Sequence, residues 1–178
     1  MVNIRSASIT DNSSVWSILE PVFRAGDTYT LPRDITRKAA LSYWFADGNK
    51  VFVAEEDGNV LGTYYLRANQ RGGGSHVCNC GYVTAAQATG RGIARTMCLH
   101  SQEQARKSGF RAMQFNFVVS ANERAVKLWQ SLGFEVVGRL PLAFEHPSTG
   151  FVDALVMFVA LKDGSDSNAP DFFTDVQE

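Results

Sequence analysis

One stretch of the chain, residues 83–94, constrains the fold more than any other. Its sequence is Val-Thr-Ala-Ala-Gln-Ala-Thr-Gly-Arg-Gly-Ile-Ala, which reads as a strand end, a loop with two glycines and the start of a long helix. The first turn of a helix presents unpaired backbone N–H groups and about half a positive charge. Glycine lets an anion approach such a backbone closely. The stretch therefore predicts a diphosphate site made mostly of main-chain amides, within an α/β domain.

Two common phosphate-binding motifs do not explain this loop. A P-loop requires GxxxxGK followed by Ser or Thr, and residues 83–94 contain no lysine. A dinucleotide-binding fold places GxGxxG after its first strand, with an acidic residue about 20 positions later. Here the loop follows the fourth expected strand, and the glycine spacing differs. An ordinary glycine-rich turn without a ligand stays open as the alternative from this loop alone.

The hydrophobic pattern predicts alternating strands and helices along the chain. Asp57-Gly58, between two apolar runs, predicts a tight hairpin, and Asp34 is the expected N-cap of a second helix. Expected strands lie at residues 2–8, 50–55, 60–67, 76–84, 113–119, 135–139 and 151–161. The first expected helix follows the capping run 10–13 and ends at about residue 25. The other expected helices lie at about 34–44, 91–107 and 122–132. This order predicts one α/β domain over residues 1–162, with a mixed, twisted sheet of about seven strands flanked by helices.

Composition bounds the class of protein. The chain has 178 residues, 45% of them hydrophobic, which fits a single domain with a substantial core. No apolar run approaches the ~20 residues that span a bilayer, and the first residues lack the layout of a signal peptide. We therefore expect a cytoplasmic protein that does not bind membranes.

Charge and cysteine usage narrow the partners. Residues 163–178 contain five acidic and no basic residues, and we expect them to form a mobile tail. The remaining, mildly positive body suits a polyanionic cofactor but lacks the clustered basic stripe of nucleic-acid-binding proteins. Cys78, Cys80 and Cys98 are expected to be reduced thiols, and no metal site is expected, because no second Cys or His pair stands at ligand spacing.

A second block follows the glycine loop: Asn122-x-x-Ala125-x-x-Leu128-Trp129, then Leu-Gly-Phe at 132–134. Together with residues 89–94 it resembles the Gcn5-related N-acetyltransferase (GNAT) family. That family carries Gln/Arg-x-x-Gly-x-Gly/Ala between its fourth strand and third helix. The match departs only at Thr89, and a register starting at Gln87 also fits. The resemblance covers about residues 2–161 and implies direct acetyl transfer from acetyl-CoA to an amine.

The same resemblance implies which residues hold acetyl-CoA. They belong to the end of the fourth strand, the glycine loop and the start of the fourth helix. The implied residues are Tyr82, Val83, Thr84, Thr89, Gly90, Arg91, Gly92, Ile93, Ala94 and Asn122.

The catalytic groups depart from the usual family pattern. Many relatives have a Tyr at the position of Trp129, proposed to protonate the leaving thiolate, and an indole cannot do this. Trp129 is therefore either core or a wall of the acyl pocket. Asn122 could stabilise the sulfur through its NH2 group or could merely cap its helix, and we expect the catalytic role. The backbone N–H of Tyr82 is expected to polarise the thioester carbonyl.

The acceptor side resembles a narrower group. The segments Asn-Cys-Gly-Tyr at 79–82 and Met-Gln-Phe-Asn at 113–116 look like the fungal acetyltransferases that detoxify proline analogues such as azetidine-2-carboxylate. This resemblance implies that Asn79 holds the acceptor carboxylate, with the backbone amides of Asn116 and Phe117. A structural hydrogen bond is the alternative for Asn79. Gly81 predicts a bulge or a close backbone approach in the same strand.

The expected function is N-acetylation of a small-molecule amine, plausible acceptors being an amino or imino acid or a toxic analogue. A protein N-terminal or lysine acetyltransferase is one alternative. A non-catalytic coenzyme A-binding regulator is another, because no general base is evident. The weak candidates for a base are His76, Glu145, His146 and Asp153. The oligomeric state stays open between monomer and homodimer.

Overall fold

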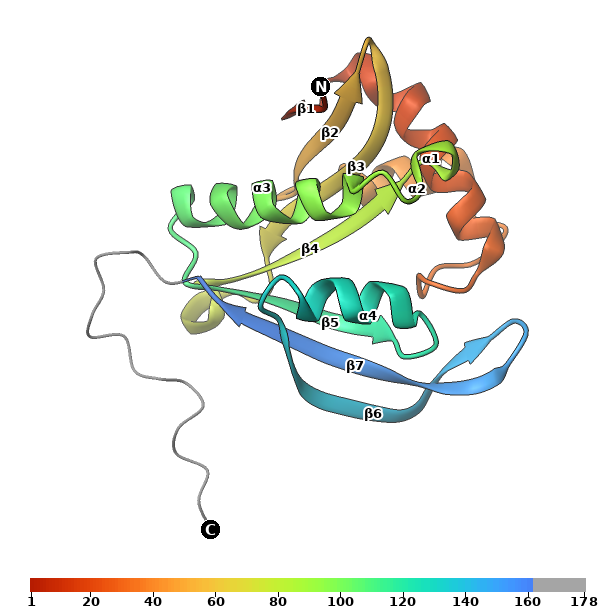
Figure 1. Ribbon diagram of the computed structural model, residues 1–178, viewed down its shortest axis with the longest axis vertical. Helices are drawn as coiled ribbons and strands as arrows, with labels where there is room; N and C mark the ends of the chain where they lie inside the picture. The colour runs from red at the N-terminus through yellow and green to blue at the C-terminus, as the bar shows by residue number, and fades with distance from the viewer. Residues whose placement is uncertain (162–178) are drawn as a thin grey trace.

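The computed structural model describes residues 1–161 and shows a seven-stranded sheet with helices on both faces (Figure 1). The strand order is β1-β2-β3-β4-β5-β7-β6. The elements are β1 (Asn3–Ser6), α1 (Asn12–Ala25), α2 (Arg37–Trp44), β2 (Lys50–Glu56), β3 (Asn59–Ala68), β4 (Val77–Thr84), α3 (Ile93–Lys107), β5 (Ala112–Val119), α4 (Glu123–Gln130), β6 (Glu135–His146) and β7 (Gly150–Ala160). The predicted fold class and the mixed sheet are confirmed. The tail predicted at 163–178 lies outside the described residues.

The alternation of side chains along β3 places α2 and α3 on opposite faces of the sheet. Trp44 of α2 packs against Tyr65 and donates its Nε1–H to Thr63 Oγ1 at 3.0 Å. Tyr64, between them in sequence, points the other way and contacts His100 of α3. The core therefore lies on both sides of the sheet.

The central feature of the sheet is the divergence of β4 and β5. Strands β1 to β4 pair antiparallel, whereas β4 and β5 are parallel and pair only at Val77–Ala112 and Cys78–Met113. Beyond these pairs the two strands separate, as Figure 1 shows. At the next position the amide Nδ2 of Asn79 donates to the carbonyl of Gln114 at 2.9 Å, in place of a ladder hydrogen bond. The sheet therefore opens like a V toward the carboxyl ends of both strands.

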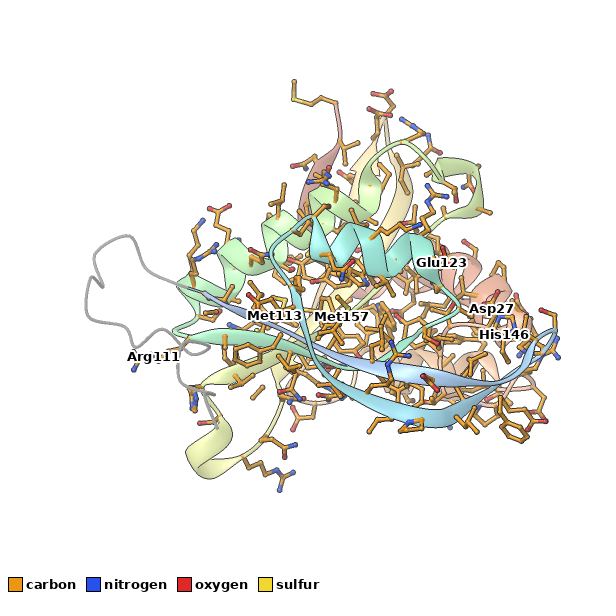
Figure 2. All side chains as sticks on the ribbon, turned by 60° about the horizontal axis from the view of Figure 1, so that its bottom comes forward. Asp27, Arg111, Met113, Glu123, His146 and Met157 are labelled. Carbon is orange, nitrogen blue, oxygen red and sulfur yellow. The ribbon has the colours of Figure 1, made fainter. Side chains whose placement is uncertain are left out.

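The β5–β7 pair contributes fully buried side chains to the core. Met113 and Met157, which Figure 2 labels in the middle of the molecule, are completely buried. Phe115 stacks on Phe134 with ring centroids 4.2 Å apart. The three cysteines are buried and unpaired. Burial raises the pKa of the Cys98 thiol to about 11, so it stays protonated at neutral pH.

Three predicted boundaries were wrong. Asp34 does not cap α2; Thr36 does, accepting a hydrogen bond from the backbone N–H of Ala39 at 3.2 Å. Helix α3 begins at Ile93, two residues later than expected, because Gly92 has a left-handed backbone with φ 79°. Strand β6 continues to residue 146 instead of ending at 139. Its pairing shifts between Leu140 and Phe144, and this bulge accommodates a proline that reads from sequence as a strand end.

Candidate functional site

The glycine loop forms a strand-to-helix turn with exposed backbone donors. After β4, residues 86–88 make one 3-10 turn, and Gly90 and Gly92 then adopt φ 85° and 79°. These left-handed values favour glycine strongly. A Cβ added at Gly92 would meet nothing within 4 Å. The first backbone bond of α3 runs from Thr96 N to Gly92 O, so the preceding N–H groups of the first turn have no backbone acceptor within residues 1–161.

Three arginines surround this loop. Arg91 forms an ion pair with Glu56, and Arg95 donates to Ser131 Oγ at 2.7 Å. Arg124, on the first turn of α4, approaches the loop from another element: its Nη2 is 3.9 Å from the position of a Cβ at Gly90. Its side chain makes no ion pair or hydrogen bond to another described residue. Sequence reasoning missed Arg124, although it occupies a variable position of the second motif block.

A pocket of about 320 Å³ lies where β4 and β5 diverge. It brings together five of the residues predicted for the site, which come from three separate segments of the chain: Asn79, Tyr82, Asn116, Phe117 and Asn122. The predicted coenzyme residues 83–84 and 89–94 do not line it. Thr28 also lines the pocket. Figure 2 labels Asp27, which precedes Thr28, and Glu123, which follows Asn122, at the same end of the molecule. The predicted residues thus fall into a pocket group and a loop group.

The backbone of Tyr82 faces the opening between the strands. The bonds Ala85 N to Leu61 O and Asn69 N to Val77 O fix the odd-numbered residues of β4 as those that bond to β3. Tyr82 is even-numbered, so its N–H and C=O point toward β5, which has already diverged. Its C=O accepts a hydrogen bond from the Tyr29 hydroxyl at 3.1 Å. Its N–H finds no acceptor in the part of the chain that the structure describes, and so is available to a ligand.

Asn122 caps a helix and also lines the pocket. Its Oδ1 accepts from the backbone N–H of Ala125 at 3.2 Å, which makes it the N-cap of α4. Its NH2 group has no protein partner among residues 1–161, and the side chain lines the pocket. Trp129, about two helical turns further on, is 9% exposed, and its ring centroid lies 5.2 Å from those of both Tyr82 and Phe115. It is core and pocket wall at once.

Asn79 and Asn116, two of the residues predicted to bind the acceptor, make polar contacts between strands. Asn79 is 6% exposed; besides its bond to the Gln114 carbonyl, its Oδ1 accepts from the Tyr65 hydroxyl at 3.5 Å. The structural alternative for Asn79 is therefore present in the fold. Asn116 and Phe117 form a bulge where the β5–β7 pairing shifts. The amide of Asn116 is bonded to Asn69 at 2.6 Å, which leaves mainly the bulge backbone facing the pocket.

The candidates for a general base lie elsewhere. His76 contacts the carbonyl of Gly73 at 3.0 Å, and Asp153 is bonded to Arg139 at 2.6 Å and to the N–H of Leu142. Neither lines the pocket, nor do residues 145 and 146 at the end of β6. No Asp, Glu or His lies among the described residues that form the pocket wall. Proton removal from an acceptor by a pocket carboxylate or imidazole is therefore not supported.

We expect Gly81→Ala to destabilise the protein by about 1–3 kcal/mol, because a Cβ at Gly81 would lie 2.6 Å from the ring of Tyr65. Tyr65 is packed against Trp44 and cannot move freely. Gly73→Ala is the matched control, since its added Cβ would meet nothing within 4 Å. Denaturant unfolding of both variants checks this. Equal free energies of unfolding would show that the Tyr65 ring can shift to accommodate the added methyl group without loss of stability.

Comparison with known proteins decides the family. Residues 13–134 match the family model described as the acetyltransferase (GNAT) family. The chain belongs to the GNAT family. A GCN5-related N-acetyltransferase from Kribbella flavida is 39% identical and superposes with a TM-score of 0.85, over 89% of this chain and 97% of that one. The N-acetyltransferase aca1 of Schizosaccharomyces pombe is 27% identical over 148 residues, covering 74% of this chain and 71% of the relative.

A third relative bears on the cofactor. The structure of yncA from Salmonella typhimurium, described with its cofactor acetyl-CoA, superposes with a TM-score of 0.80 at 22% identity, over 97% of this chain and 99% of that one. As a member of the GNAT family this protein is an N-acetyltransferase, and the family uses acetyl-CoA as acetyl donor. No three His, Cys, Asp or Glu side chains among residues 1–161 are grouped to hold a metal ion. Within residues 1–161, none of the helices has the length and apolar character that a membrane span requires.

Proposed function

We propose that this GNAT protein acetylates the amine of a small molecule, with an amino or imino acid, or a toxic analogue of one, as acceptor. The observation that carries the proposal is the pocket between β4 and β5. Its volume of about 320 Å³ lies at the small end of ligand pockets. The Tyr29 hydroxyl is bonded to the β4 backbone across one side of it. Such a pocket favours a small acceptor over a polypeptide, which needs an open groove.

In this proposal acetyl-CoA binds along the two groups of predicted residues, within a catalytic domain of residues 1–162. The N–H groups of residue 90 and residues 92–94 and the α3 helix dipole attract the pyrophosphate, and Arg124 adds a cation beside Gly90. The pantetheine chain enters between the diverged strands, where Val83 and Thr84 end β4. This places the thioester at the inner end of the pocket, near Tyr82 and Asn122.

The proposed reaction is direct transfer. The neutral amine attacks the thioester carbonyl, a C–N bond forms, the C–S bond breaks, and the sulfur leaves as a thiolate. The Tyr82 N–H stabilises the negative charge on the carbonyl oxygen, and the Asn122 NH2 group stabilises the sulfur. Since no Asp, Glu or His of residues 1–161 lines the pocket, water removes the amine proton. The kcat/KM should then rise with pH until the pKa of the acceptor amine is passed.

A thiol-release screen tests the proposal. Acetyl-CoA is supplied with amino acids, imino acids, polyamines, aminoglycosides and a peptide with a free N-terminus, and free coenzyme A is measured. Turnover with an amino or imino acid supports it. Turnover with the peptide alone would assign the protein to the protein acetyltransferases. Tight acetyl-CoA binding without turnover on any amine would make it a coenzyme A-binding regulator.

A further inference from the structure

The pocket wall carries one charged side chain within residues 1–161, and that charge is positive. Arg67, near the end of β3, lines the pocket together with neutral polar and aromatic residues. Its guanidinium lies over the ring of Tyr65, 5.1 Å from the centroid. Its side chain makes no ion pair and no hydrogen bond with any other described residue. The guanidinium is thus held in place by the aromatic ring, while its N–H donors are left for a ligand.

Other arginines of the fold, unlike Arg67, have acidic partners among the described residues. Arg5 pairs with Asp11 and Glu55, and Arg91 pairs with Glu56. Arg67 is half-buried in a pocket with no acidic side chain. A cation that is partly withdrawn from water and lacks a counterion favours an anionic ligand.

The neighbours of Arg67 suit the same ligand. In the β3–β4 ladder Arg67 stands directly opposite Asn79, on the same face of the sheet. The bulge at Asn116 and Phe117 lies across the β4–β5 opening and lines the same pocket. These groups offer N–H donors but no charge. A planar guanidinium beside amide donors matches the geometry of a carboxylate, which it can bind through two parallel hydrogen bonds.

The coenzyme does not account for this cation. Its phosphates are proposed to lie at the glycine loop, and no residue from 86 to 94 lines the pocket. The anion at Arg67 must then come from the acceptor. We propose that Arg67 binds the carboxylate of the acceptor, and that the acceptor class is amino or imino acids with a free carboxylate. This inference rests on the proposed function. It places the carboxylate at Arg67 and the amine beside Tyr82 and Asn122, and it disfavours polyamines and aminoglycosides.

The test compares amino and imino acids with their own primary amides, which keep the amine and side chain but lack the negative charge. Wild-type enzyme should prefer each reactive acid over its amide by roughly 10- to 100-fold in kcat/KM. Arg67→Gln should abolish this preference by raising KM for the acid, with kcat largely kept, as expected for lost binding that is equal in ground and transition states. Arg67→Lys should restore only part of it, because an ammonium group lacks the planar fork.

Arg71→Gln is the matched control. Arg71 is exposed, lies four residues further along the chain and does not line the pocket, so its removal changes the net charge equally and should leave the preference intact. The inference is overturned if wild-type enzyme uses amides as well as acids, or if Arg67→Gln keeps the preference. Either result leaves the N-acetyltransferase proposal standing. Absence of turnover on every amine overturns both.

Discussion

Gly92→Asp should abolish acetyl-CoA binding, so that a calorimetric titration with a clear heat of binding for the wild-type protein gives none for the variant. Gly92 immediately precedes α3, with φ 79°. Its Cβ position opens onto free space within the described structure. In the proposed complex that space holds the pyrophosphate. The aspartate would add bulk there and a negative charge facing two phosphates, and it would cancel the attraction of the helix dipole.

A matched variant separates this effect from backbone strain. Gly48, between α2 and β2, has φ 84°, and a Cβ there also meets nothing within 4 Å. Gly48→Asp therefore imposes a similar left-handed strain, of about 1–2 kcal/mol, and the same change in charge, far along the chain from the loop. It should bind acetyl-CoA normally. Unchanged affinity in Gly92→Asp would refute the pyrophosphate assignment, whereas equal loss in both variants would trace the defect to folding.

The parts of the fold that sequence predicted well are those determined by local chemistry. Asp57 and Gly58 were expected to form a tight hairpin turn, and both have positive φ, 51° and 77°, as a two-residue turn requires. The glycine loop and the long helix after it were also predicted, because glycine conformation and helical periodicity are determined by residues that are close together in the sequence. The same is true of the turn after α3, where Gly109 has φ 81°.

Three of the misses, the end of β6 and the places of Arg124 and Arg67, share a different cause, since each depends on residues far apart in the chain. β6 extends past its proline because β7 pairs with it across a bulge. Arg124 approaches Gly90 only because the fold brings the first turn of α4 near the glycine loop. Arg67 reads in sequence as a polar residue at a strand end. Arg67 lines the pocket because β4 and β5 diverge, and the residues around position 67 do not predict that divergence.

Asn122→Ala should lower kcat by on the order of 10²-fold with little change in KM. The sulfur of acetyl-CoA gains negative charge only as the C–S bond breaks, so a donor to it acts mainly in the transition state. Trp129, on α4, has no titratable proton to offer. The free NH2 group of Asn122 is the side-chain amide donor of α4 that lines the pocket.

The capping bond complicates the alanine variant, because loss of Oδ1 removes the bond to Ala125 N and costs about 1 kcal/mol of stability. Asn122→Asp resolves this. An aspartate has nearly the same shape and caps a helix as well, but it replaces the NH2 donor by a carboxylate oxygen that repels the thiolate. It should keep the wild-type unfolding free energy and lose at least as much kcat as Asn122→Ala. Asn122→Ser also caps well, is too short to reach the sulfur, and should be similarly slow. Wild-type turnover in Asn122→Ser would reduce Asn122 to a helix cap, and the sulfur donor would then have to be sought among the other groups that line the pocket.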